Sequence, residues 1–339
     1  MADMRPVDPN LVPKLKLKGG EKMPMIGMGT FGSDRYDAAQ VAGAVRGAAR
    51  AGYRLFDCAS VYGNEALIGP VFAEIMGEGV SRDELFITSK VWNDMHGPGQ
   101  AIASCEQTLR DLRLDYVDLF FVHWPFPNFH PKGAAPDYHN PDSRPFIIQE
   151  FMGVWQQLQT LKARGLTRHI GVSNMTIPKM ELFLKECGEP PAAVEMEMHP
   201  CFQQEELLRY MVGHGIAPIG FCPLGSPERP ERDVTPGDVS DMEHPVVQAI
   251  AAAHGVHPAL VCLKWAVQRG HAAIPFSVRP EEYISNLRAV TEDPLTDQEM
   301  RAIKAVESGC RLVKGQVFLW GEHKDWRLLW DEDGAIAGW

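Results

Sequence analysis

Polar residues of four different chemical types stand at or just after the ends of consecutive predicted strands. Asp57 closes the strand Tyr-Arg-Leu-Phe-Asp, and Tyr62 follows it closely. Lys90 closes Leu-Phe-Ile-Thr-Ser-Lys, and His123 closes Val-Asp-Leu-Phe-Phe-Val-His. The carboxyl ends of barrel strands meet at one face, where an acid, a phenol, an amine and an imidazole could transfer protons to a carbonyl group. Buried strands also end on polar residues by chance, but chance rarely places these four types in succession.

Length, charge and cysteine use set the limits for any interpretation. A chain of 339 residues fits one large α/β barrel or two smaller domains. The net charge of -11 argues against nucleic acid as a partner, since phosphate binding needs clustered cations. Residues 1–18 do not resemble a signal peptide, and no stretch approaches the ~20 apolar residues of a membrane span. Seven dispersed cysteines without a Cys-x-x-Cys pair indicate reduced thiols. We therefore expect a cytoplasmic protein without membrane or nucleic-acid partners, monomeric or weakly dimeric.

Hydrophobic periodicity predicts short strands that alternate with amphipathic helices. The predicted strands cover residues 24–28, 53–57, 85–90, 116–123, 168–173, 193–199, 216–221 and 272–276. The predicted helices cover residues 37–51, 65–76, 99–112, 149–164, 178–187, 204–214, 245–255, 260–268 and 280–290. Eight βα units without a break in composition predict a single (β/α)8 TIM barrel over residues 1–339, with a hairpin at its N-terminus.

Three segments do not fit the repeat. Residues 124–147 are rich in Pro, His and Asn, and residues 224–243 are rich in Pro, Asp and Arg. Residues 312–339 form a tail that contains four tryptophans. Long irregular loops in a compact domain are usually functional, so we expect substrate-side loops and an aromatic tail over or beside the barrel.

Gly27 to Gly32 match the dinucleotide pattern G-x-G-x-x-G, which would suggest a Rossmann dehydrogenase. The preceding strand is short and opens with Pro24, whereas a Rossmann first strand is long and central. Eight βα units outweigh so short a motif.

Glu195, Glu197 and His199 alternate along one strand and share a face, as iron or zinc ligands could. Inward-facing polar residues of a barrel also hydrogen-bond one another or a cofactor, and we favour that interpretation. We therefore expect no metal site.

Several motifs together resemble the aldo-keto reductase superfamily, in particular its aldose-reductase-like and xylose-reductase-like branches. The resemblance covers nearly all of residues 14–310 and implies the same barrel fold. It rests on Gly-Met-Gly-Thr-Phe (27–31), Phe-Asp-Cys-Ala-Ser-Val-Tyr-Gly-Asn-Glu (56–65), Thr-Ser-Lys-Val-Trp (88–92), Val-His-Trp-Pro (122–125), His-Ile-Gly-Val-Ser-Asn (169–174), Cys-Pro-Leu-Gly-Ser (222–226) and Ile-Pro-Phe-Ser (274–277).

The resemblance assigns catalytic roles to the four residues at the strand ends. It implies that Tyr62 gives a proton to the carbonyl oxygen while hydride comes from the nicotinamide C4. A free phenol titrates near ~10, so Lys90 is expected to favour the phenolate. Asp57 is expected to hold Lys90 by an ion pair, and His123 to orient the carbonyl.

The resemblance also implies a site for a nicotinamide dinucleotide. Ser173 and Asn174 match the pair that holds the carboxamide, Glu195 replaces a usual Gln, and Phe221 replaces a stacking Tyr. The other implied contacts are Gly29, Thr30, Asp57, Cys222, Pro223, Leu224, Ser226, Phe276, Ser277, Val278, Arg279, Glu282 and Asn286.

The residues that match the adenosine end of the cofactor site do not agree on whether the cofactor is NAD(H) or NADP(H). Phe276 and Glu282 stand where the family has Lys and Arg, which favours NAD(H). Arg279 and the habit of the family favour NADP(H), so NADP(H) is narrowly preferred and some use of NAD(H) is expected. Glu228 matches an acid that clasps the cofactor, but its partners match the uncharged Gly32 and Phe276.

Phe31, Trp92 and Trp124 match the aromatic substrate pocket of the family, with Phe31 in place of a usual Trp. Sugars, ketones and polycyclic alcohols all remain open as substrates. The sequence predicts an NAD(P)H-dependent carbonyl reductase or alcohol dehydrogenase acting on a small aldehyde, ketone or sugar. The alternative is a cofactor-binding regulatory or scaffold barrel that resembles the β-subunits of potassium channels, but such a barrel has no need of all four catalytic residues.

Overall fold

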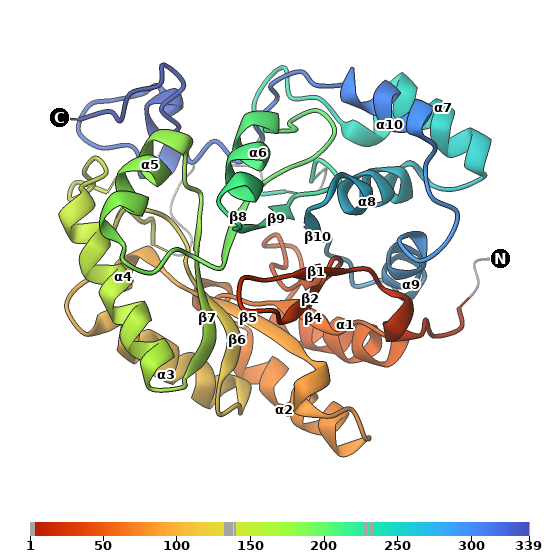
Figure 1. Ribbon diagram of the computed structural model, residues 1–339, viewed down its shortest axis with the longest axis horizontal. Helices are drawn as coiled ribbons and strands as arrows, with labels where there is room; N and C mark the ends of the chain where they lie inside the picture. The colour runs from red at the N-terminus through yellow and green to blue at the C-terminus, as the bar shows by residue number, and fades with distance from the viewer. Residues whose placement is uncertain (1–3, 132–137, 139, 227–228, 231–232, 339) are drawn as a thin grey trace.

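Eight parallel strands form the centre of the molecule (Figure 1). A computed structural model describes residues 4–131, 138, 140–226, 229–230 and 233–338. The strands are β3 (Met28–Gly29), β4 (Leu55–Asp57), β5 (Phe86–Val91), β6 (Val117–Val122), β7 (Thr167–Ser173), β8 (Ala193–Glu197), β9 (Ala217–Phe221) and β10 (Ala272–Ile274). They lie in chain order, each parallel to the next, which confirms the predicted (β/α)8 barrel.

Backbone hydrogen bonds between the first and last strands close the ring. The amide of Gly27 donates to the Ala273 carbonyl, and the amide of Ala273 donates to the Met25 carbonyl, each at 2.9 Å. The amide of Gly29 donates to the Pro275 carbonyl at 2.9 Å. A sheet closed in this way is not the open sheet of a dinucleotide-binding domain.

The glycines of the Gly27–Gly32 motif are needed for packing in this barrel. A Cβ atom on Gly27 would lie 2.6 Å from Leu55 Cγ and 2.9 Å from Ile274 Cδ1. A Cβ atom on Gly32 would lie 2.7 Å from the Tyr36 carbonyl oxygen. The Rossmann interpretation of this motif is therefore wrong, since the short first strand leaves no room for side chains beside its neighbours.

In the part of the chain that the structure describes, ten α-helices surround the strands (Figure 1). They are α1 (Ala38–Ala51), α2 (Glu65–Gly77), α3 (Gln100–Leu112), α4 (Ile148–Ala163), α5 (Ile177–Glu186), α6 (Glu205–Gly213), α7 (Pro245–His254), α8 (Pro258–Arg269), α9 (Pro280–Ala289) and α10 (Asp297–Lys304). Nine of them match predicted helices. Helix α10 was not predicted, although Thr296 and Glu299 form a capping box at its start that the sequence already contains.

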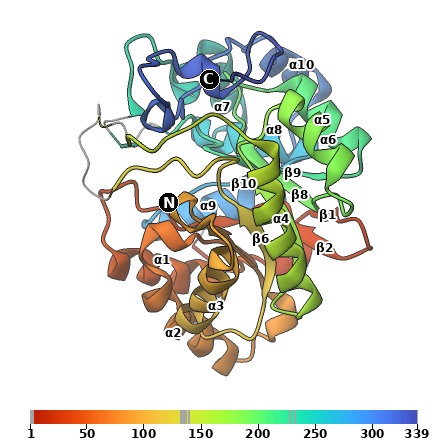
Figure 2. The ribbon, with the colours of Figure 1, turned by 90° about the vertical axis from the view of Figure 1, so that its left-hand side faces the viewer.

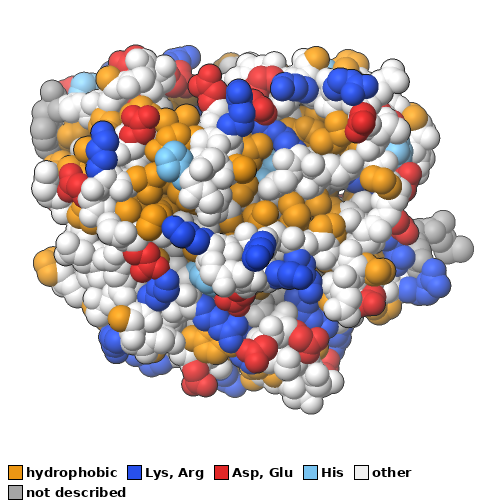
Figure 3. All heavy atoms as spheres, in the orientation of Figure 1, with side chains coloured by type: hydrophobic (Ala, Val, Ile, Leu, Met, Phe, Trp, Pro, Cys, Tyr) orange, Lys and Arg blue, Asp and Glu red, His pale blue; other side chains and the backbone are white. Residues whose placement is uncertain are grey.

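The N-terminal segment forms the expected hairpin from β1 (Lys14–Lys16) and β2 (Lys22–Pro24). Leu17 and Met23 of the hairpin pack against the inner residues of the barrel and close that end. The predicted first strand is partly wrong, since Pro24 pairs with Lys14 in the hairpin. Figure 2 shows the hairpin on the side opposite the long loop after β6. Lys and Arg side chains gather around it on the face of Figure 3.

The twofold alternation of side chains along each strand selects the inner residues. Leu55, Phe86, Phe121 and Ala193 belong to the apolar cluster inside the barrel. Because side chains two residues apart share a face, Asp57 follows Leu55 inward, and the same rule directs Lys90, His123 and Glu195 inward. The polar residues therefore form a layer above an apolar one, toward the carboxyl ends of the strands.

The tail after α10 packs onto the loops at that end of the barrel. The indole nitrogen of Trp330 donates to the Lys314 carbonyl at 2.8 Å, and Asn128 Nδ2 donates to the Phe318 carbonyl at 2.7 Å. Asp331 forms a buried ion pair with Lys179 of α5 at 2.5 Å. These contacts hold the tail against the loop after β6 and the helix after β7.

No single helix in the described part of the chain is long and apolar enough to cross a membrane, and α7 with α8 reach that length and composition only together, across a bend of 95°.

Candidate active site

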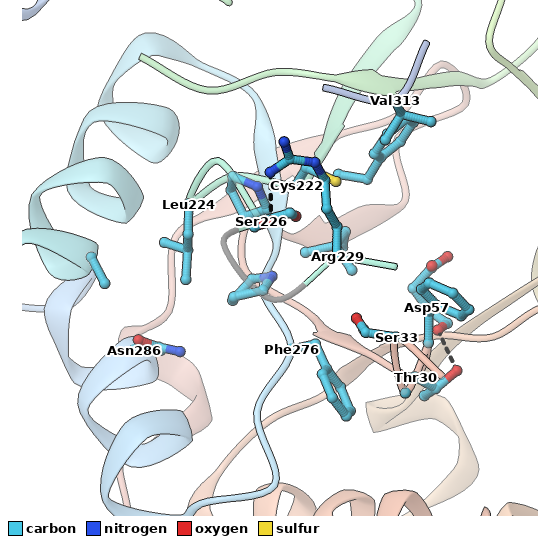
Figure 4. Close-up of a pocket in the computed structure, with 18 of the residues that line it drawn as sticks. Thr30, Ser33, Asp57, Cys222, Leu224, Ser226, Arg229, Phe276, Asn286 and Val313 are labelled. Carbon is cyan, nitrogen blue, oxygen red and sulfur yellow. Dashed lines mark hydrogen bonds between the residues drawn. The ribbon is translucent and has the colours of Figure 1, made fainter. Parts of the chain in front are cut away.

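One cavity of about 1770 Å³ occupies the carboxyl ends of the strands. Figure 4 shows side chains that line it from the loops after β3 and β9, from the end of β4, from the segment after β10 and from α9. The predicted site residues on its wall are Gly29, Thr30, Phe31, Asp57, Tyr62, Trp92, His123, Trp124, Asn174, Glu195, Phe221, Cys222, Pro223, Leu224, Ser226, Phe276, Arg279, Glu282 and Asn286. Four other predicted site residues, Lys90, Ser173, Ser277 and Val278, are not among the residues that line the cavity.

Lys90 and Asp57 form a buried ion pair beneath the cavity. Lys90 Nζ donates to both carboxylate oxygens of Asp57, at 2.6 and 2.5 Å, and Thr88 Oγ1 donates to Asp57 Oδ1 at 2.6 Å. The Lys90 side chain has no solvent exposure. Burial alone would lower the pKa of Lys90, but Asp57 and Glu195 raise it well above its ordinary value. Lys90 is therefore a fixed positive charge.

Tyr62 lies above this ion pair, in the short 3-10 helix η2 (Ser60–Tyr62), and is only partly buried. Lys90 Nζ is 5.7 Å from the centre of the Tyr62 ring. Burial raises the pKa of Tyr62 well above its ordinary value, although Lys90 opposes this rise. The phenol therefore keeps its proton at neutral pH.

His123 lies beside Tyr62, with their ring centres 5.9 Å apart and the rings nearly perpendicular, at 81°. Its Nδ1 atom is buried and has no hydrogen-bond partner among the residues that the structure describes. Burial, together with the charge of Lys90 and with His96, holds the pKa of His123 well below its ordinary value. A neutral imidazole here can donate or accept a hydrogen bond without adding charge.

Asn174 and Glu195 both line the cavity, and each has one buried oxygen without a hydrogen-bond partner among the described residues. Asn174 Nδ2 donates to the His123 carbonyl at 2.9 Å and to Ser173 Oγ at 3.2 Å, which leaves its Oδ1 buried and without a described partner. Ser173 Oγ donates to the Glu195 carbonyl at 2.9 Å. These orphaned oxygens, with Phe221 on the same wall, fit a planar carboxamide-bearing ring such as nicotinamide.

Glu195 contacts the catalytic ion pair as well as the cavity. Its Oε1 lies 3.4 Å from Lys90 Nζ, and its Oε2 is buried without a partner in the described structure. Burial raises the pKa of Glu195 to about 8, Asp57 adds to the rise, and Lys90 opposes it. Two carboxyl groups thus share one ammonium group.

The loop after β9 forms another part of the wall. Leu224, Ser226 and Arg229 line the cavity, and Figure 4 shows Arg229 turned back toward Ser226, whose carbonyl oxygen accepts from Arg229 Nη1 at 3.2 Å. Gly225 has a φ of 69°, and a Cβ atom there would lie 2.1 Å from Asp241 Oδ2, so only glycine fits. Glu228, the expected clasp residue, lies outside the described residues.

The adenosine end of the predicted site contains its own ion pair. Arg279 Nε lies 2.9 Å from Glu282 Oε1, and Ser277 Oγ donates to Glu282 Oε2 at 2.6 Å. Arg279 and Ser277, which could contact a 2′-phosphate, therefore both already contact the Glu282 carboxylate. Phe276 packs on Tyr36, with ring centres 5.8 Å apart.

Aromatic rings line the cavity on the side of Tyr62 that lies away from α9. Phe31 packs on Tyr62, with ring centres 5.2 Å apart. Trp92 packs on His123, with ring centres 5.0 Å apart. Trp124 packs on Phe318 of the tail, with ring centres 4.6 Å apart. This surface suits an apolar or ring-shaped substrate.

Sequence reasoning missed several residues of the wall. Phe318 is the aromatic residue of the tail that lines the cavity. Trp320 and Trp330, two of the four tryptophans for which the tail was singled out, are buried in packing contacts. Val313, His130 and Arg229 also lie on the wall. No motif marks these residues, because their positions depend on how the loops fold back.

Glu197 and His199 bond to other side chains at the end of the barrel strand β8. Their side chains form a buried cluster with Asp241 of the 3-10 helix η6 (Asp241–Glu243), with His199 Nε2 3.0 Å from Glu197 Oε1 and His199 Nδ1 2.8 Å from Asp241 Oδ2. Over the described residues, no group of three or more His, Cys, Asp or Glu could hold a metal ion. The contact between Glu197 and His199 is the kind expected of inward-facing polar residues that bond one another.

Comparisons with known proteins agree with this geometry. The model of the Aldo/keto reductase family matches residues 25–308. An aldo/keto reductase of Synechocystis is 40% identical over 93% of this chain and 95% of its own length, and Aldo-keto reductase family 1 member A1 of Xenopus tropicalis is 37% identical over 87% and 88%. The crystal structure of a Bombyx mori aldo-keto reductase in complex with NADP is 28% identical and superposes with a TM-score of 0.78, covering 91% of this chain and 95% of that chain. The chain belongs to the aldo/keto reductase family.

Proposed function

We propose that the protein is an NAD(P)H-dependent carbonyl reductase in which Tyr62 is the general acid and, in the reverse direction, the general base. The observation that carries this proposal is the buried Asp57–Lys90 ion pair beneath Tyr62, at the wall of a cavity that His123 also lines. Its substrate is a small aldehyde, ketone or sugar, or the corresponding alcohol. We propose further that the protein acts in the cytoplasm, as a monomer or a weak dimer.

When bound, the nicotinamide supplies the hydride in reduction. Tyr62 transfers its proton to the carbonyl oxygen, and the phenolate that remains is stabilised by the Lys90 ammonium group. Asp57 holds Lys90 in place and keeps it charged. His123, held neutral by burial, hydrogen-bonds the carbonyl oxygen and directs it toward Tyr62. The aromatic wall around Trp92 and Phe318 excludes water from this proton transfer.

The proposed cofactor residues divide between the two ends of the cavity. Asn174 and Glu195 would hold the carboxamide, and Phe221 would stack on the nicotinamide ring. The loop from Leu224 to Ser226 would cover the pyrophosphate. The remaining proposed contacts at the adenosine end are Phe276, Ser277, Val278, Arg279, Glu282 and Asn286.

NADP(H) remains the narrowly preferred cofactor in this proposal, with NAD(H) also used. Arg279 and the NADP complex of the Bombyx mori reductase support NADP(H). The contacts of Glu282 with Arg279 and Ser277 weaken that preference, because a 2′-phosphate would lie near this carboxylate. Exchanging Phe276→Lys together with Glu282→Arg should tighten NADPH more than NADH, by ~1 to 3 kcal/mol for each new contact. Dissociation constants for both nucleotides would test this, with Glu281→Gln as the control.

Replacing Tyr62 by Phe tests the function itself. The change removes only the hydroxyl that transfers the proton, so kcat should fall by ~10² to 10⁴ while the dissociation constant of the cofactor stays nearly the same. Steady-state rates with a panel of aldehydes and ketones, together with fluorescence titration of the cofactor, measure both effects. Near-normal turnover by the variant would show that Tyr62 is not the acid. A wild-type protein that binds cofactor but reduces no carbonyl would instead support the scaffold alternative.

A further inference from the structure

Hydrogen-bonding capacity is unevenly distributed at the end of the cavity where Asn174 and Glu195 lie. An Asn side chain has two amide hydrogens to donate, and those of Asn174 go to the His123 carbonyl and to Ser173 Oγ. The hydroxyl hydrogen of Ser173 goes to the Glu195 carbonyl. The atoms of this group that remain unpartnered are Asn174 Oδ1 and Glu195 Oε2, and both are oxygens.

A carboxamide needs both a donor and an acceptor from its site. Its NH₂ group can donate to Asn174 Oδ1, but its oxygen then needs a donor. An ionised Glu195 is an acceptor only, whereas a protonated Glu195 has one O–H to donate. Of the three side chains, only Glu195 can supply the missing donor, and it can do so only when it carries a proton.

The surroundings of Glu195 favour the protonated form. The side chain is buried, and Asp57 places a second carboxylate near it, while Lys90 is the single ammonium that both face. Tyr62 is the other titratable group that interacts with Glu195. The neighbouring strands contribute Ser173 and Phe221 here, which do not titrate in the accessible range. One positive charge between two carboxyl groups leaves room for a proton on one of them.

We infer that Glu195 is a positioning residue that binds the cofactor carboxamide in its protonated form, so that cofactor binding takes up a proton from solvent when Glu195 is ionised beforehand. The inference depends on the nicotinamide cofactor of the proposed function. The proton enters as a hydrogen ion, adds to the carboxylate and remains there as the O–H of a carboxylic acid. It is not consumed in the reaction.

The same inference gives a second role to this proton. An ionised Glu195 adds negative charge beside Lys90 and opposes formation of the Tyr62 phenolate. Protonated Glu195 leaves Lys90 with Asp57 as its counter-ion, so Tyr62 releases its proton more easily. Cofactor binding therefore prepares the site for the proton transfer that follows.

Proton uptake on cofactor binding is the direct test. NADPH is titrated into the wild-type protein by isothermal titration calorimetry, in two buffers of different ionisation enthalpy. The number of protons taken up per NADPH should rise toward one as the pH increases through the titration of Glu195. The dissociation constant should rise about tenfold per pH unit above that transition. Glu195→Gln, which keeps a permanent donor, should bind with little pH dependence and without proton uptake. Glu65→Gln removes another buried carboxylate, one bonded to Ser89 and Thr108, and should behave as the wild type does.

Each outcome decides for or against the inference. Absence of proton uptake by the wild-type protein overturns it without any variant, so the test stands even if Glu195→Gln folds poorly. Uptake that persists in Glu195→Gln assigns the proton to another group and also overturns it. A protein that reduces carbonyls but shows no uptake keeps its proposed function and loses this inference. A protein that shows uptake but no reduction keeps the inference and loses the function.

Discussion

Two buried clusters of charged side chains each include one glutamate of strand β8. The two clusters have similar compositions but different surroundings. In the cluster of the proposed active site, called the catalytic cluster below, Asp57 and Glu195 flank the ammonium group of Lys90. In the second cluster, Glu197 and Asp241 flank the imidazole of His199. Glu195 and Glu197 are two residues apart on the strand, and both clusters place two carboxyl groups around one basic group.

The second cluster is closed by backbone amides. The amides of Leu312 and Val313 donate to the two carboxylate oxygens of Glu197, at 2.7 and 2.8 Å, and the amide of Cys201 donates to Asp241 Oδ1 at 2.7 Å. The cluster therefore ties the start of the tail to the barrel. The catalytic cluster instead leaves Glu195 Oε2 without a partner at the cavity wall.

The difference teaches that charge alone does not distinguish a site from a structural element. In the second cluster three carboxylate oxygens accept from backbone amides, and the fourth, Asp241 Oδ2, lies 2.8 Å from His199 Nδ1. A buried ionic cluster whose carboxylates are tied to the backbone in this way holds chain segments in place. An unpartnered buried oxygen at a cavity wall destabilises the folded protein, and it is best explained by a ligand that supplies the missing hydrogen bond when it binds. The five predictions that follow test this contrast, from the largest expected effect to the smallest.

Removing the basic group from the catalytic cluster should abolish most activity. Lys90→Met should lower kcat by ~10² to 10⁴, because the Tyr62 phenolate loses its stabilising charge. The two residues act as a unit, so the double variant with Tyr62→Phe should lose little more than either single variant. Steady-state kinetics of the three variants measure this coupling. Losses that multiply would show that Lys90 acts independently of Tyr62.

Removing the basic group from the closed cluster should instead reduce stability. His199→Gln removes the imidazole that lies between the buried carboxylates of Glu197 and Asp241, which should cost about 3 to 5 kcal/mol of unfolding free energy. The surviving folded enzyme should keep a kcat near that of the wild type. Denaturant unfolding and kcat at low temperature are the measurements. A large loss of kcat at unchanged stability would contradict the structural role.

The pH dependence of stability provides a control for His199. Burial alone would lower the pKa of His199, but Asp241 and Glu197 raise it to about 9. The folded protein therefore holds this proton more tightly than the unfolded chain, so its contribution is complete below the ordinary pKa near ~6.5 and is lost as pH rises through about 9. This alkaline loss of stability should be absent in His199→Gln.

Gly225→Ala should disturb the loop after β9 from the side of the closed cluster. The new methyl group would meet Asp241 Oδ2, and the left-handed backbone at this position disfavours any side chain. We expect a loss of about 1 to 3 kcal/mol of stability and weaker cofactor binding. Gly188→Ala is a matched control, since its φ is 66° and nothing lies within 4 Å of the added carbon. Equal effects of the two changes would mean that backbone strain alone, without Asp241, explains the loss.

Glu195→Gln should have the smallest effect on stability, and its sign depends on pH. Because burial raises the pKa of Glu195 to about 8, the folded protein holds this proton more tightly than the unfolded chain. The contribution of protonated Glu195 to the free energy of unfolding is complete below the ordinary pKa of a glutamate. It is lost as pH rises through about 8, where the ionised and buried carboxylate destabilises the fold. The variant should therefore gain stability relative to the wild type as pH rises, on the order of 1 kcal/mol, since the lost attraction to Lys90 offsets part of the gain. Thermal unfolding at several pH values measures this, and a difference that does not change with pH would contradict it.

The barrel, and the placing of Asp57, Lys90 and His123 at or just after the ends of its strands, could be predicted because both depend on local sequence. Strands such as 85–90 and 116–123 show their length and their polar ends directly, and parallel strands bring such ends together. Helix α10 was also visible in principle, through its capping box at Thr296 and Glu299. Boundaries were less certain, as Pro24 shows, since pairing with Lys14 decided its place.

The sequence by itself determined the fold class, the inward direction of Asp57, Lys90, His123 and Glu195, and the chemistry these groups offer. Only the tertiary structure decided which carboxyl groups share Lys90, that Glu197 belongs to a closed cluster, and that Phe318 reaches the cavity. The physical reason is range. Strand periodicity depends on neighbours a few residues apart, whereas hydrogen-bond satisfaction and burial depend on residues such as Asp241 and Leu312, which meet β8 only after the loop and the tail have folded onto the barrel.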